Sequence, residues 1–119
     1  MAQWLDFKGK VVDAGHARSR KAYQFFYLVQ DLRTSIKYPV FVTVERRRGR
    51  GAGEQEESGF EVGDTVRVAG KMQAVIGVPL AGMKMIEQSD VQNTGPSSRP
   101  FSNATALIPE EMEKVQDAF

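Results

Sequence analysis

A basic stretch and an aromatic stretch follow each other directly between residues 15 and 30. The basic stretch carries Arg18, Arg20 and Lys21, and the aromatic one places Tyr23, Phe25 and Tyr27 at alternate positions. Planar rings stack on nucleic-acid bases, and cationic side chains contact phosphates. This combination is typical of a surface that binds single-stranded nucleic acid, and we predict that these six residues form its centre.

More basic residues continue the candidate surface along the chain. Residues 46–51 read Arg-Arg-Arg-Gly-Arg-Gly, similar to short Arg/Gly segments that bind single strands through charge and guanidinium stacking. Three glutamates at positions 54, 56 and 57 oppose that charge, so a self-neutralising loop is the competing interpretation. The predicted nucleic-acid contacts are completed by Arg33, Lys37, Arg46, Arg47, Arg48 and Arg50.

The side chains that most often carry catalysis are scarce. The chain has no cysteine, which excludes disulfides, thiolate metal sites and cysteine nucleophiles. His16 is the only histidine, and no carboxylate at a recognisable spacing supports it as a catalytic or metal-binding residue. No phosphate-cradling or metalloenzyme motif occurs. We therefore expect a binding protein rather than an enzyme, with no catalytic residues, metal site or cofactor.

Five short strands are expected to position these residues, which makes the predicted fold mostly β. Each segment is rich in β-branched or aromatic residues, and turn signals separate them. The segments are Trp4–Val12, Ala22–Gln30, Ile36–Val44, Phe60–Met72 and Met83–Glu87. Residues 46–59 hold no apolar side chain larger than alanine and are predicted to be a loop.

The fourth segment carries a specific resemblance. Residues 60–71, Phe-Glu-Val-Gly-Asp-Thr-Val-Arg-Val-Ala-Gly-Lys, resemble the run that often begins the fourth strand of OB-fold nucleic-acid-binding domains. Together with residues 9–12 and 25–31, the resemblance covers roughly residues 4–90. It implies a five-stranded barrel that binds oligonucleotides on strands 2 and 3, between the loops that join strands 1–2 and 4–5. OB domains commonly place a helix between strands 3 and 4, but the Arg/Gly/Glu-rich loop stands there, so SH3-like and other small barrels stay open.

The aromatic strand offers two faces, and the sequence does not choose between them. If Phe26 and Leu28 point into the barrel, then Tyr23, Phe25 and Tyr27 point outward. The reverse assignment buries those three rings and exposes Phe26 and Leu28. Either choice is expected to leave at least one large aromatic side chain on the outer face.

The predicted barrel occupies residues 1–91, and residues 92–119 form a flexible tail that ends in a short helix. Residues 92–105 have the composition of a linker. Beyond them, four apolar residues recur at helical spacing and form a predicted partner-binding stripe: Ile108, Met112, Val115 and Phe119. The acidic end also resembles the tails of single-stranded-DNA-binding proteins, which recruit partners and can occupy the protein's own basic groove.

Length and charge limit the remaining classes. A length of 119 residues is typical of a single domain. The net charge of +1 produces no strong overall electrostatic field. No signal peptide or membrane span is recognised, so a cytoplasmic location is expected. The predicted function is binding of single-stranded nucleic acid, DNA rather than RNA, by a homo-oligomer that assists replication, repair or mobile-element maintenance. The alternative is an adaptor barrel that assembles with proteins and never contacts nucleic acid.

Overall fold

The computed structural model describes residues 4–18, 22–45, 59–91 and 104–115, and it is mostly β. The described residues form five strands and one helix. In chain order these are β1 (Trp4–Arg18), β2 (Ala22–Asp31), β3 (Lys37–Glu45), β4 (Thr65–Val75), α1 (Leu80–Gln88) and β5 (Ala104–Lys114). Strands were correctly predicted in these first four places, but β1 continues to Arg18 rather than ending at Val12, and β4 begins at Thr65 rather than at Phe60. No helix among the described residues has the length and apolar character needed to span a membrane.

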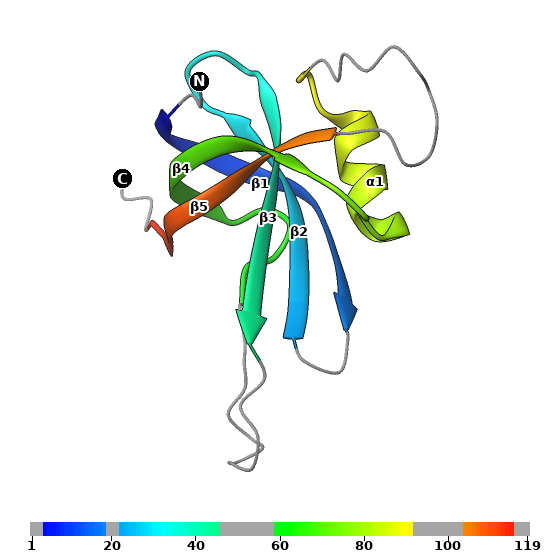
Figure 1. Cartoon of the computed structure of the whole chain (residues 1–119). Coiled ribbons are helices and arrows are strands. Elements are labelled where there is room, and N and C mark those ends of the chain that lie inside the picture. The colour runs from blue at the N-terminus through cyan, green and yellow to red at the C-terminus, as the bar shows by residue number, and fades with distance from the viewer. Residues whose placement is uncertain (1–3, 19–21, 46–58, 92–103, 116–119) are drawn as a thin grey trace.

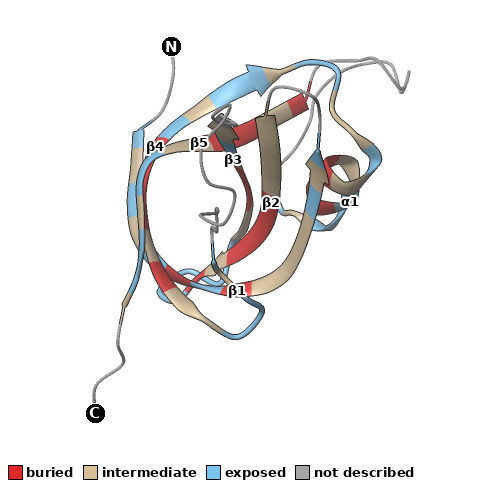
Figure 2. Ribbon diagram, turned by 90° about the horizontal axis from the view of Figure 1, so that it is seen from below, coloured by how far each residue is buried: buried red, intermediate tan, exposed pale blue. Residues whose placement is uncertain are grey.

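The five strands close into a ring in the order β1-β2-β3-β5-β4 (Figures 1 and 2). β1 serves two neighbours: its first half, Trp4–Lys10, pairs with β4, and Gly9–Arg18 pairs with β2. These pairs are antiparallel, whereas β3 and β5 run parallel and meet at Val40 and Leu107. The sheet is therefore mixed, and the short β3–β5 contact closes it.

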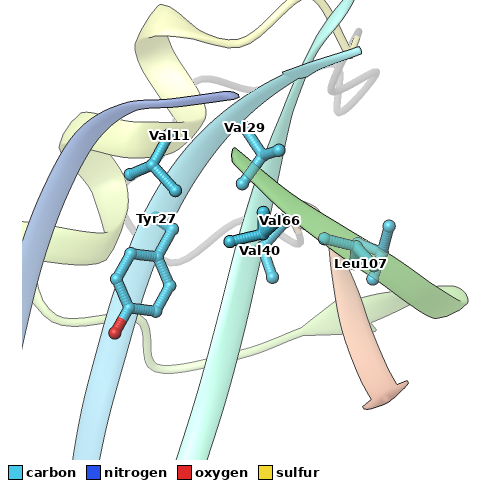
Figure 3. Packing of buried hydrophobic residues seen from close by; sticks show 7 residues of the cluster. Val11, Tyr27, Val29, Val40, Val66 and Leu107 are labelled. Carbon is cyan, nitrogen blue, oxygen red and sulfur yellow. The ribbon is translucent and has the colours of Figure 1, made fainter. Parts of the chain in front are cut away.

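The hydrophobic core fills the inside of this ring. Every strand contributes a fully buried side chain, and Figure 3 shows them converging from the surrounding strands. These residues include Val11, Val29, Val40, Val66 and Leu107, each with no exposed surface. Burial of such side chains stabilises a fold by about 1.5–3 kcal/mol each.

A second apolar cluster lies on the outer face, where α1 packs across β1, β2 and β3. Phe26, Leu28 and Phe41 point toward the helix and are almost completely buried. Gly82 allows the helix to come close, since a methyl group there would lie 3.0 Å from the Phe26 ring. The Gln88 side-chain amide donates a hydrogen bond to the Asp13 carboxylate (2.7 Å), which fixes the end of the helix to β1.

Two predicted elements were wrong. Residues 83–87, expected as the fifth strand, belong to α1, and residues 108–114 of the segment expected as a C-terminal helix belong to β5. The fifth strand therefore comes from the segment that was interpreted as a tail. Residues beyond 91 complete the ring, so the predicted boundary between barrel and tail does not separate two structural units.

The predicted apolar stripe also changes, because a bulge between Ile108 and Met112 shifts the alternation of the strand by one residue and turns these two side chains to opposite faces. Ile108 packs with the cluster under α1, whereas Met112 packs with the core inside the ring. Val115 follows β5, where its backbone N–H donates to the carbonyl oxygen of Thr65 (2.8 Å). Phe119 lies outside the described residues.

Candidate nucleic-acid interface

A groove of about 910 Å³ opens at one end of the ring. There β1, β2 and β3 run past the other two strands and lie side by side, as their lower halves do in Figure 1. The described residues that line the groove are Ala14, Gly15, His16, Ala17, Arg18, Tyr23, Phe25, Tyr27, Gly59, Phe60 and Glu61. One wall is the β1–β2 ladder, and the segment that precedes β4 forms the other.

Strand register places the aromatic and basic side chains on one face of that ladder. Tyr23 lies opposite Arg18, Phe25 opposite His16, and Tyr27 opposite Ala14. Paired residues in an antiparallel ladder point to the same side of the sheet. The alternation seen in the sequence is therefore real, and this face continues the inside of the ring.

The three predicted aromatics change environment along the strand. Tyr27 is only 2% exposed and belongs to the core. Phe25 is half-buried and packs against that core, and Tyr23, at the far end, is also half-buried. Tyr23 and Phe25 thus keep ring surface in contact with the groove, whereas Tyr27 forms its floor.

The guanidinium group of Arg18 lies over the Tyr23 ring, 5.9 Å from the ring centre. This is a cation–π arrangement, which holds the cationic group beside the aromatic surface. Arg18 is exposed at the end of β1. A charge able to meet a phosphate and a ring able to meet a base are therefore neighbours in the groove.

The opposite wall is held by ring packing and by a tight turn. The rings of Phe60 and Tyr27 meet edge to face, with centres 5.6 Å apart. After Phe60, residues 61–64 form a turn in which the Asp64 N–H donates to the Glu61 carbonyl oxygen (3.0 Å). The Val11 N–H donates to the Asp64 carbonyl oxygen (2.9 Å), which ties the turn to β1.

The structure brings together only part of the predicted set. Arg18, Tyr23 and Phe25 share the groove, whereas Arg33 and Lys37 lie at the opposite end of β2, around its turn into β3. The remaining predicted contacts lie outside the described residues: Arg20, Lys21, Arg46, Arg47, Arg48 and Arg50. These contacts belong to residues 19–21 and 46–58. The described residues next to these two segments lie at the groove end of the sheet, since Ala22 pairs with Glu45 and Gly59 lines the groove.

The expectation of a bare aromatic on the outer face of β2 was wrong. Phe26 occupies that face and is 1% exposed, because α1 covers it. The alternation of a strand distinguishes only an inner face and an outer face. Here α1 covers the outer face, so side chains on both faces of β2 are buried. Phe60 and Glu61 also line the groove but were not predicted to do so, because they lie far from β2 in the sequence and meet it only in the folded chain.

Among the described residues, two side chains have displaced pKa values, and neither lines the groove. Burial raises the pKa of Tyr38, and the nearby Asp31 carboxylate raises it further. On the outer side of the ring, the hydrogen bond that the Arg67 guanidinium donates to the Asp6 carboxylate (2.8 Å) raises the pKa of Arg67. Within the described ranges, no group of three or more His, Asp or Glu residues is arranged to hold a metal ion.

Comparison with known proteins adds no relative from which a role could be transferred. No protein-family model matches the chain, and neither a curated protein nor a solved structure matches it.

Proposed function

We propose that this protein binds single-stranded nucleic acid in the groove at the open end of the ring, without catalysing a reaction. The observation that carries the proposal is the shared placement of Arg18, Tyr23 and Phe25 on one groove wall. Single-strand binding requires an aromatic surface beside positive charge, because every base has a face that can stack.

We further propose that the ring is an OB-fold barrel. The order β1-β2-β3-β5-β4 supports this, because β5 returns to lie between β3 and β4 in Greek-key fashion. One departure is the helix, which stands between β4 and β5 rather than between β3 and β4. As α1 covers the outer face of β2 and β3, the proposed site uses the inner face at the ring's mouth.

In the proposed complex, one or more bases stack on the Tyr23 and Phe25 side of the groove, and Arg18 contacts a neighbouring phosphate. Stacking of this kind contributes about 1–3 kcal/mol per base and tolerates every base. The basic residues at 20–21 and 46–50 adjoin the groove end in the sequence and are the natural source of further phosphate contacts. DNA is the first substrate to test.

The test is a fluorescence-polarisation titration of the full chain with labelled single- and double-stranded DNA at several salt concentrations. Replacing Arg18 with Gln removes one phosphate contact, so the log–log salt slope should become shallower by about 0.7 and the affinity should fall. Arg33→Gln is the matched control, since Arg33 is also exposed but lies at the other end of β2. Tyr23→Ala should weaken binding while the chain still unfolds cooperatively.

Absence of binding at low salt, or binding that ignores salt, would contradict the proposal. It would favour the adaptor, in which the groove wall meets another protein or a second copy. Light scattering of the same samples measures the oligomeric state that this rival needs. Equal losses of affinity for Arg18→Gln and Arg33→Gln would show that binding depends on the net charge and not on the position of the charge. The groove would then not be the binding site.

A further inference from the structure

The groove contains one feature that phosphate binding does not explain, the carboxylate of Glu61. Glu61 is the only acidic residue among the described residues that line the groove. It is exposed, and no ion pair joins it to another described residue. A negative charge repels a phosphate and weakens a purely electrostatic site. Its presence in this wall is better explained by a contact to the bases.

The position of Glu61 is fixed by the turn that carries it. Its backbone N–H donates a hydrogen bond to the Asp64 carboxylate (2.9 Å), and its carbonyl oxygen accepts one from the Asp64 N–H (3.0 Å). Gly63 has a φ of 100°, a conformation that favours glycine, and its N–H donates to the Val11 carbonyl oxygen (2.8 Å). The turn is therefore held to β1, and Glu61 stands on the wall that faces Tyr23 and Phe25.

The chemistry of a carboxylate restricts what it can recognise. An ionised carboxylate accepts hydrogen bonds through two oxygens and donates none. Guanine presents two adjacent N–H donors on its Watson–Crick edge, whereas adenine and cytosine present one amino group each. Thymine has a single N–H between two carbonyl oxygens, which a carboxylate repels. In a single strand these edges are free to be bound.

We propose that Glu61 gives the groove a preference for guanine, held by two hydrogen bonds from guanine N1–H and the N2 amino group while the base stacks on the opposite wall. This inference rests on the proposed function, because it assigns a base specificity to the same groove. Tyr23 and Phe25 supply stacking that is indifferent to the base, and Glu61 adds the discrimination.

The experiment compares short thymidine oligonucleotides that carry three separated guanines with the same strands carrying inosine, adenine or cytosine at those positions. Inosine keeps N1–H but lacks the N2 amino group. The guanine strand should bind about tenfold tighter than the all-thymidine strand, and inosine should lose most of that gain. Glu61→Gln should abolish the preference and slightly raise the affinity for the all-thymidine strand, since a charge that repels phosphate is removed.

Glu87→Gln is the matched control, because Glu87 is an exposed glutamate on α1, and it should keep the guanine preference. Equal binding of all strands, with the normal salt dependence, would overturn the guanine inference and leave the proposed function standing. A preference that survives Glu61→Gln would overturn it too. Failure of every strand to bind would overturn the proposed function and this inference with it.

Discussion

Because residues 104–114 form a strand of the ring, we predict that Leu107 contributes strongly to the stability of the fold. This side chain has no exposed surface and packs among core residues of the facing strands, including Val40 and Val66. Truncation of a fully buried leucine to alanine costs about 2–5 kcal/mol, from lost burial and the cavity left behind. A domain of this size has roughly 5–15 kcal/mol of stability in total, so Leu107→Ala should remove a large share.

The assay is urea unfolding followed by circular dichroism, with a thermal melt in parallel. The midpoint should fall while the slope with urea is retained, and the melting temperature should drop by at least about 8 °C. Leu80→Ala is the matched control: Leu80 is 75% exposed at the start of α1, so the same truncation should change stability by less than about 0.5 kcal/mol. Equal effects of the two substitutions would refute the placement of β5 in the core.

Two further predictions concern the strand ladder and the opposite end of the ring. Gly70→Ala should destabilise the protein by about 1–3 kcal/mol in the same urea assay, because the added methyl group would collide with the backbone of Ile108 and Pro109. The raised pKa of Tyr38 means that the folded chain keeps a phenol proton which the unfolded chain releases, so stability should fall as the pH rises above about 10. Tyr38→Phe should make that alkaline loss shallower, which urea midpoints measured from pH 8 to 11 would detect.

Much of the ring could be predicted because β1 to β4 carry local signals. Valines and aromatics alternate with polar residues in these segments, and the pleat of a strand turns that alternation into two faces. The Gly63–Asp64 pair before β4 is a local sequence signal that is typical of a tight turn. The structure has a tight turn there, with Gly63 in a positive-φ conformation. At these positions the local preference and the final fold agree.

β5 could not be predicted in this way, because its local signals favour a helix. Glutamate, methionine and lysine are good helix formers, and propensity is a weak preference that tertiary contacts override. The pairing with β4 contains a bulge opposite Ala69 and Gly70, which shifts the alternation by one residue. As a result Leu107 and Met112 both face the core although they are five residues apart.

The opposite error, at α1, has a related cause. Its nine residues are too few to form a stable isolated helix in water, and the glycine at position 82 weakens it further. Its stability comes from docking, since Met85 and Ile86 are buried against the outer face of the sheet. That surface exists only after the ring has formed, so the segment alone does not reveal it.

The candidate site could be predicted in part, because one of its features is a local sequence pattern and the other depends on the complete fold. Alternation in β2 already put Tyr23 and Phe25 on one face, and the register of β1 adds Arg18 to it. Which face meets water depends on α1, which belongs to a distant part of the chain and covers Phe26. With the middle of β2 buried on both faces, aromatic surface on this strand reaches solvent only where the strand leaves the ring. The proposed site therefore lies at the open end of the sheet, where the aromatic side chains of β2 are accessible to a base.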